Sequence, residues 1–163
     1  MKIFTALFLL LIIPLITFGQ EVKDLPYIQN DLFVSNAFGF PATVRNFQKK
    51  YGRNFTIRKE PVKNTHDRSV VDTVYTFSSG RTKIQVYKAK HRDILQSAFI
   101  DTDRIPLKYN IKVGESKTDI AKRLKASITA DKVQVGDLEH GQVYTLTFSK
   151  GKLRAISYQG YVD

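Results

Sequence analysis

Three groups of side chains have the chemistry to bind a metal or to transfer protons, because each pairs a histidine with a nearby carboxylate. They are His66 with Asp67, His91 with Asp93, and Glu139 with His140. No two histidines have the H-x-H, H-x-x-x-H or H-E-x-x-H spacing that presents two ligands from one element. All three lie in turn-like sequence, so we expect exposed loop histidines, with no metal and no cofactor.

Nucleophilic catalysis has equally little support in the sequence. There is no cysteine, so a catalytic thiol, a disulfide framework and a Cys-ligated metal are excluded. Ser78, Ser79 and Ser149 fall in expected hairpin turns, no G-x-S-x-G motif occurs, and the glycines form neither a P-loop nor a dinucleotide fingerprint. We therefore expect a protein that is not an enzyme. A small hydrolase without a recognisable motif is the alternative that stays open.

Two short segments of the chain match one another. Residues 76–81 (Thr-Phe-Ser-Ser-Gly-Arg) correspond to residues 147–152 (Thr-Phe-Ser-Lys-Gly-Lys) at a spacing of 71, which also aligns Tyr87 with Tyr158. In both segments apolar and polar residues alternate before the glycine, as in a half-buried strand. The glycine then permits a tight hairpin turn. The sequence therefore predicts a tandem repeat of one structural unit.

One short helix is predicted upstream of each hairpin. The first begins near Pro41 and ends at Gly52, and the second begins after Ser116, whose hydroxyl is suited to an N-cap. Apolar residues at helical spacing form one stripe on each helix. They are Phe40, Val44, Phe47 and Tyr51 in the first helix, and Ile120, Leu124 and Ile128 in the second.

Further strands complete each unit. Residues 54–59 and 132–135 are predicted to follow the two helices, and residues 93–101 to be the last strand of the first copy. Copies of about 70 residues barely support a core of their own, so we expect them to pack as one body with a joined sheet. The predicted fold class is α+β, with two tandem repeats of one or two helices packed on a three- to four-stranded antiparallel sheet. The first repeat spans residues 20–103 and the second residues 104–163.

Residues 1–19 are predicted to be a cleaved secretory signal peptide. Lys2 is their only charge, residues 6–13 are uninterrupted apolar, and Thr17 and Gly19 are small residues two apart. A retained membrane anchor is the alternative, although Pro14 interrupts the apolar stretch. Removing these residues leaves 144 of 163, with 25 basic and 15 acidic residues and a net charge of +10. We expect a periplasmic or secreted protein with no transmembrane segment after cleavage and no nucleic-acid partner.

The predicted binding surface is the open face, the side of the sheet without helices. In each hairpin we expect the apolar residues of the first strand to face the helices. Strict alternation then places three residues of the second strand on the open face, namely a basic residue, the residue two positions later and the tyrosine four positions later. These residues are Lys83, Gln85 and Tyr87 in the first copy, and Arg154, Ile156 and Tyr158 in the second. Tyrosines with cationic rims are frequent in protein interfaces. In the alternative interpretation the cations are merely solvated and the tyrosines pair across strands.

A resemblance supports an envelope protein. Residues 111–120 (Ile-Lys-Val-Gly-Glu-Ser-Lys-Thr-Asp-Ile), the helix that contains Leu124, and the strands up to Tyr158 resemble small bacterial envelope modules of the SmpA/OmlA type. These share a helix-plus-sheet unit with the tandem-repeat beta-lactamase inhibitor protein (BLIP). The resemblance implies a periplasmic protein-binding or assembly module. The chain departs from it in having neither a lipobox cysteine nor a disulfide pair, which excludes a lipoprotein.

The sequence thus predicts an exported, non-enzymatic module that binds another envelope or secreted protein through its open face. The alternative is a cationic protein that adheres to an anionic envelope surface, lipid or lipopolysaccharide, through its net charge. Basic residues on the two predicted helices would serve that alternative. They are Arg45, Lys49, Lys50 and Arg53 on the first helix, and Lys117, Lys122, Arg123 and Lys125 on the second.

Overall fold

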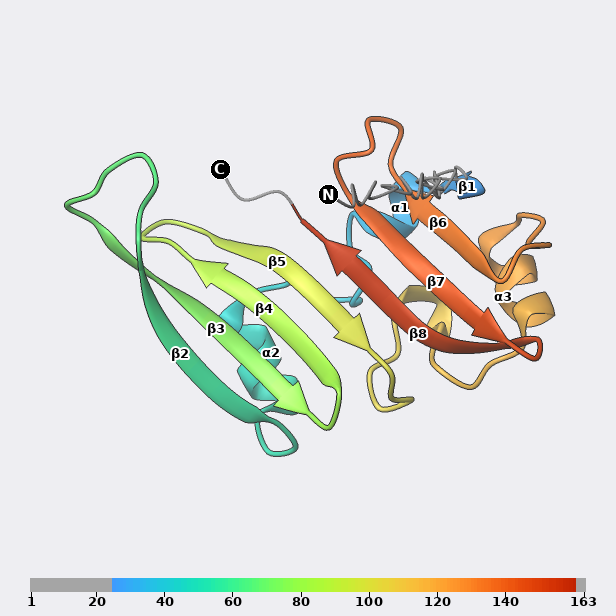
Figure 1. Ribbon diagram of the computed structural model, residues 1–163, viewed down its shortest axis with the longest axis horizontal. Helices are drawn as coiled ribbons and strands as arrows, with labels where there is room; N and C mark the ends of the chain where they lie inside the picture. The colour runs from blue at the N-terminus through green and yellow to red at the C-terminus, as the bar shows by residue number, and fades with distance from the viewer. Residues whose placement is uncertain (1–24, 161–163) are drawn as a thin grey trace, which may run out of the picture.

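Eight strands form one continuous mixed sheet in the computed structural model, which describes residues 25–160 (Figure 1). The sheet order is β1-β6-β7-β8-β5-β4-β3-β2, and every neighbouring pair is antiparallel except β1 with β6. The strands are β1 (Tyr27–Gln29), β2 (Thr56–Lys63), β3 (Val71–Ser79), β4 (Thr82–Lys88), β5 (Asp93–Ile100), β6 (Lys132–Gly136), β7 (Val143–Ser149) and β8 (Lys152–Gln159). The helices are α1 (Asp31–Val34), α2 (Val44–Tyr51) and α3 (Lys117–Leu124), with a short 3-10 helix at Lys108–Asn110.

The predicted fold class is wrong. The chain is mostly sheet, with 43% strand and 17% helix, and its strands belong to a single eight-stranded mixed sheet rather than to three- or four-stranded sheets of two repeats. Strand β5 hydrogen-bonds to β8 over Ser97–Ile100 and Ile156–Gln159, which joins the two halves. The short β1 adds a parallel strand beside β6 in the far half. Both contacts join residues far apart in sequence, so no local pattern indicates them.

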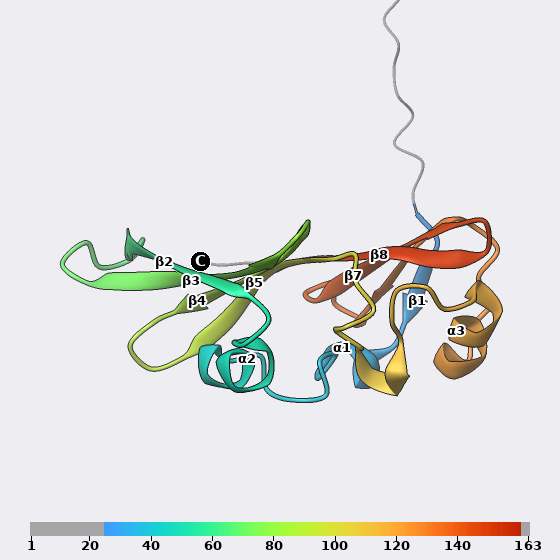
Figure 2. The same ribbon diagram turned by 90° about the horizontal axis from the view of Figure 1, so that it is seen from below.

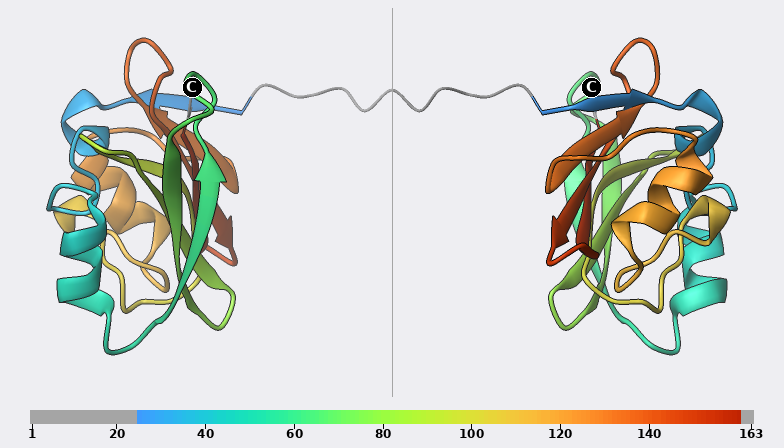
Figure 3. Two further views of the ribbon diagram at one scale, coloured as in Figure 1. Left: turned by 90° about the vertical axis from the view of Figure 1, so that its left-hand side faces the viewer. Right: turned by 90° about the vertical axis from the view of Figure 1, so that its right-hand side faces the viewer.

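The helices within residues 25–160 all cover the same face of the sheet, and none of them covers the other face (Figures 2 and 3). Nearly all buried apolar side chains form one cluster between the two layers, to which both halves contribute; Val74 and Tyr87 are the buried apolar side chains outside it. In the first half, Phe47 of α2 packs on Phe77 of β3, with ring centroids 5.5 Å apart. In the second half, Ile120 and Leu124 of α3 are buried in the same cluster. The uncovered side of the sheet is the open face.

Local sequence signals set the ends of both long helices. The Thr43 hydroxyl accepts a hydrogen bond from the backbone of Asn46 at the start of α2, and Gly52 ends that helix. Ser116 caps α3 as predicted, because its hydroxyl accepts the backbone N–H of Asp119 at 3.1 Å. Such caps satisfy backbone donors that have no partner within the helix. The stripe of α3 is shorter than predicted, since the helix ends at Leu124 and Ile128 follows it.

The two edges of the sheet are poorly suited to pairing with another strand. Strand β2 carries charged residues at Arg58, Lys59 and Glu60 and a proline at Pro61, which removes a backbone donor. At the other edge β1 is only three residues long. The edges of the described sheet therefore disfavour the addition of a further strand. The predicted signal peptide, residues 1–19, lies outside the described residues.

Candidate functional site

The three site residues predicted on β4 do share the open face. Lys83 pairs with Ser78 and Gln85 with Thr76 across β3, and no bulge interrupts this hairpin. Lys83 is exposed and Gln85 is half-buried. The Gln85 amide accepts a hydrogen bond from the Ser97 hydroxyl at 3.0 Å and donates one to Thr76 at 3.4 Å. Gln85 is therefore held in place by its cross-strand neighbours.

Tyr87 is buried, contrary to the exposed ring that the sequence predicts. Its hydroxyl donates to the Asp72 carboxylate at 2.5 Å, and the Asn64 amide donates to the same carboxylate oxygen at 2.7 Å. These hydrogen bonds lower the pKa of Asp72, and the bond to Asp72 raises the pKa of Tyr87. Because the backbone N–H groups of His66 and Asp67 bond to Asn64, the cluster fastens the β2–β3 loop. Tyr87 therefore anchors this loop.

The three site residues predicted on β8 do not lie together on the open face. Phe148 pairs with Leu153, but Thr147 pairs with Ala155, so Arg154 is an extra residue in β8. Such a bulge shifts the alternation by one, and every later side chain changes face. Ile156 is 1% exposed and Tyr158 is 8% exposed, both in the core under the helices, while Arg154 is exposed at the bulge.

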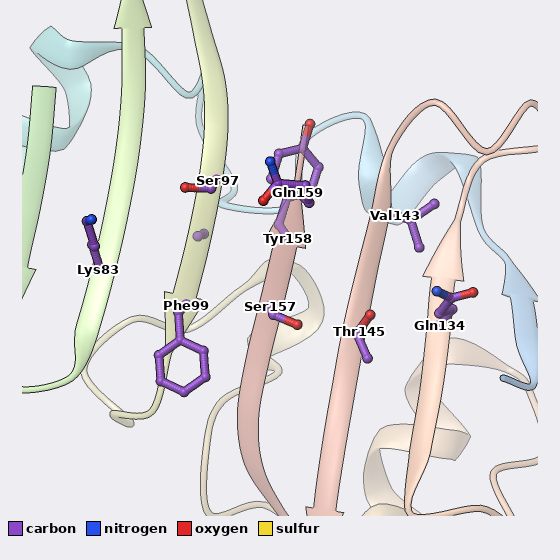
Figure 4. A pocket seen from close by; sticks show the side chains of 10 residues that line it. Lys83, Ser97, Phe99, Gln134, Val143, Thr145, Ser157, Tyr158 and Gln159 are labelled. Carbon is purple, nitrogen blue, oxygen red and sulfur yellow. The ribbon is translucent and has the colours of Figure 1, made fainter. Parts of the chain in front are cut away.

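A row of side chains from five strands crosses the open face at the junction of the two halves (Figure 4). Register places Lys83 of β4 beside Phe99 of β5, and Phe99 beside Ser157 of β8. The row continues from Ser157 to Thr145 of β7 and to Gln134 of β6. The β8 bulge turns Ser157 outward into this row, in place of the predicted Ile156 and Tyr158.

This row crosses a shallow trough of about 480 Å³. Short side chains, Ser97, Ser157 and Thr145, lie at its centre, and Phe99, 38% exposed, is its exposed aromatic ring. Clefts of this volume are typical of binding sites. Hydroxyl and amide groups here can donate and accept hydrogen bonds, while Phe99 offers apolar contact. The arrangement suits binding, and it holds no nucleophile with an adjacent base.

Charge is nearly absent from the trough. Lys83 is the one charged residue among the ten that line it, although the chain has 26 basic residues. Interfaces between proteins are likewise depleted of charge at their centre, with polar groups at the rim. The trough therefore offers shape, hydrogen-bonding groups and apolar surface rather than net charge.

Sequence reasoning missed Phe99, Ser157 and Gln134. The polar residues that alternate with Tyr144, Leu146 and Phe148 in β7 already indicate that Thr145 faces outward. Phe99 is preceded and followed by the buried Ala98 and Ile100, and the same alternation indicates that it points outward. Ser157 required knowledge of the bulge, which local alternation does not reveal.

The histidines lie apart from the trough. His66, His91 and His140 are all exposed, and His140 stacks on Tyr27 with ring centroids 4.1 Å apart. Within residues 25–160 no three His, Cys, Asp or Glu side chains are grouped as metal ligands. Within the same residues, no helix has the length and apolar character needed to cross a membrane.

Comparison with known proteins places the chain in no family. No protein-family model matches it, and no curated protein or solved structure does so either.

Proposed function

We propose that this protein is an exported, non-enzymatic binding or assembly module of the bacterial envelope, and that its open face binds another envelope or secreted protein. The observation that carries the proposal is the trough at the β5–β8 junction, on a sheet face that no described helix covers. The proposed location in the envelope is based on the composition of residues 1–19 and on the resemblance of residues 111–158 to small SmpA/OmlA-like and BLIP-like envelope modules.

The contacts of the trough indicate how a partner would be held. Phe99 provides an apolar anchor at the junction, and the hydroxyls of Ser157 and Thr145 surround the position where a partner's side chain would insert. Buried apolar anchors dominate binding energy in protein interfaces, and the polar groups around them exclude water. Because Lys83 is the one charged residue of the trough, binding there should survive high salt, which screens charge–charge attraction.

Photo-crosslinking from single positions tests this surface. A photoreactive phenylalanine analogue at position 99 should crosslink to one protein in an envelope extract, and at position 32 it should not. Leu32 is a suitable control because it is 71% exposed and lies in α1, on the helix side. Phe99→Asp and Thr145→Arg should abolish capture of the same protein, with unchanged circular dichroism. Equal crosslinking from positions 32 and 99 would contradict the proposal.

The second candidate is adhesion to an anionic envelope surface through the lysines of α3. Lys117, Lys122 and Lys125 line a hollow of about 580 Å³ on that helix, although Lys117 also forms an ion pair with Asp131 at 2.7 Å. Lys122→Glu with Lys125→Glu should then abolish binding to vesicles that contain anionic lipid. Such binding should be lost at about 1 M salt, where the Debye length is about 3 Å. Binding through the trough should persist under those conditions.

A further inference from the structure

A second hollow lies at the junction of the two halves, on the helix side of the sheet. This seam groove is bounded by the connection between α1 and α2, by the start of β5, and by Tyr144 of β7 and Tyr158 of β8. Its volume is about 510 Å³, within the range of small-molecule sites. Neither the predicted open-face site nor the proposed function uses it.

Two buried phenols in the groove lack partners. Tyr144 is 2% exposed and Tyr158 is 8% exposed, and their ring centroids are 4.7 Å apart. The hydroxyls of Tyr27 and Tyr87 have acceptors within the protein, but no described residue accepts from Tyr144 or Tyr158. Burial raises the pKa of both groups, so both remain protonated donors at neutral pH. Neither hydroxyl is fully buried, although both rings are, so the two hydroxyls open into the groove and are free to donate hydrogen bonds to a ligand.

The other lining residues define what accompanies that acceptor. Phe38, Phe40 and Leu95 supply apolar surface, and the exposed Arg92 supplies a positive charge at the start of β5. Arg92 forms no ion pair with any described residue. Asp93 also lines the groove, but its carboxylate is engaged by the backbone N–H of Val44 at 2.8 Å and by Lys88 at 3.3 Å. Among the charged residues that line the groove, Arg92 is therefore the one without a partner. The Asp137 carboxylate, which accepts hydrogen bonds from the backbone of Gly141 and Gln142, lies outside the lining but contributes to the raised pKa of Tyr158.

We propose that the seam groove binds a small carboxylic acid with an apolar body. The carboxylate accepts hydrogen bonds from the hydroxyls of Tyr144 and Tyr158 and is attracted by Arg92. The apolar body lies against Phe38 and Leu95. Each feature of this ligand answers a feature of the groove: two donors without acceptors, one cation without a counter-ion, and an apolar wall.

Titration of the ¹⁵N-labelled chain with 4-phenylbutyrate and with octanoate tests the proposal. Both probes should shift the backbone amides of Phe40, Leu95 and Gln142, which line the groove. The neutral amide 4-phenylbutyramide should bind about 10-fold more weakly, because a hydrogen bond to a charged group exceeds one to a neutral group by about 1 kcal/mol or more. If neither carboxylate shifts these amides at about 10 mM, well above a millimolar Kd, the proposal is overturned.

Matched variants separate a ligand role of the phenols from a structural one. Tyr144→Phe and Tyr158→Phe should each weaken probe binding about 10-fold, because each removes a hydrogen bond to a charged group. Arg92→Ala should also weaken it, because it removes the cation that attracts the carboxylate. Tyr51→Phe is the control, because it removes a phenol hydroxyl that has no hydrogen-bond partner in the protein and does not line the groove. Unchanged affinity in both groove variants would overturn the proposal. Tyr158 lines the trough as well as the seam groove, whereas Tyr144 lines only the groove, so the Tyr144→Phe result leaves the proposed function unaffected.

Discussion

The two hairpins β3–β4 and β7–β8 share a sequence motif but differ in turn and in register. In the first, Ser79 pairs with Thr82, so the loop is Gly80-Arg81 and only Gly80 has a positive φ, of 59°. In the second, Ser149 pairs with Lys152, so the loop is Lys150-Gly151 and both residues have positive φ, of 51° and 71°. These are the patterns of type II′ and type I′ turns.

The larger difference lies beyond the turns. Strand β4 alternates without interruption against β3, whereas β8 contains the extra residue Arg154. In consequence Gln85 lies on the open face, while the aligned Ile156 is buried under the helices. Two copies of one motif thus place different side chains on the open face. A single bulge decides which side chains line the trough.

Deleting one residue from β4 and one from β8 gives the largest expected difference in stability between the two hairpins. Deletion of Lys83 should move Ile84 and Val86, both 0% exposed, to the open face. The expected loss is about 3–6 kcal/mol of unfolding free energy, at roughly 1.5–3 kcal/mol for each buried side chain. Deletion of Arg154 removes only the extra residue and keeps Ile156 inside, so stability should change by less than about 1 kcal/mol, as for ordinary surface changes.

Urea unfolding followed by circular dichroism measures both deletions. Lys83→Ala and Arg154→Ala are the controls, because each removes the side chain and preserves the register. If both deletions lowered the unfolding free energy equally, the bulge would not explain why aligned side chains of β4 and β8 lie on opposite faces.

Truncating the aligned residues Ile156 and Gln85 gives the next largest expected difference in stability. Ile156→Ala should lower the unfolding free energy by about 3 kcal/mol, because it creates a cavity in the core. Gln85→Ala should cost about 1 kcal/mol, the net value of typical hydrogen bonds, here those to Ser97 and Thr76. Both are read from urea unfolding at neutral pH. A cost for Gln85→Ala as large as that for Ile156→Ala would contradict the assigned faces.

The aligned tyrosines should differ in their effect on acid stability. The pKa of Asp72 lies below its unfolded value because Tyr87 and then Asn64 donate to it. Its contribution is therefore present above the unfolded pKa of about 3.9 and is lost as pH falls through the folded value. Tyr87→Phe should lower stability at pH 7 and flatten its decline in acid, so that variant and wild type converge at low pH.

Tyr158→Phe is the matched control in that experiment, since Tyr158 does not contact Asp72. Its decline with acid should parallel that of the wild type, as measured by urea midpoints between about pH 7 and pH 2, a range that spans the Asp transition. Parallel acid curves for wild type and Tyr87→Phe would show that the hydrogen bond to Asp72 does not hold its pKa down.

Substitutions in the two hairpin turns give the smallest expected difference in stability. Lys150→Asn places Asn-Gly in a type I′ turn, where Asn tolerates positive φ better than Lys, and should raise stability by about 0.5 kcal/mol. Ser79→Asn at the aligned position should give no gain, because Ser79 lies in the β3 strand. Thermal unfolding of the two variants measures the difference. A gain from Ser79→Asn equal to that from Lys150→Asn would contradict the different turn positions.

Several features could be predicted because they depend on residues close in sequence. The Ser116 cap, the end of α2 at Gly52 and the two glycine hairpins each involve positions within a few residues of one another. The open-face position of Lys83 and Gln85 also follows from alternation alone, because β4 is regular against β3. The same reasoning fails in β8, where Arg154 interrupts the alternation.

The sequence by itself determined the local elements of this protein: the caps, the hairpins and the alternation of regular strands, which near neighbours specify. Only the tertiary structure decided that β5 pairs with β8, that β1 joins β6, and that Ile156 and Tyr158 turn inward. The two strand pairings join residues more than 50 positions apart, and the inward turn follows from the bulge at Arg154, which the alternation of residues does not indicate. The trough and the seam groove both lie at the β5–β8 junction, so their lining residues can be identified only after the strands are paired.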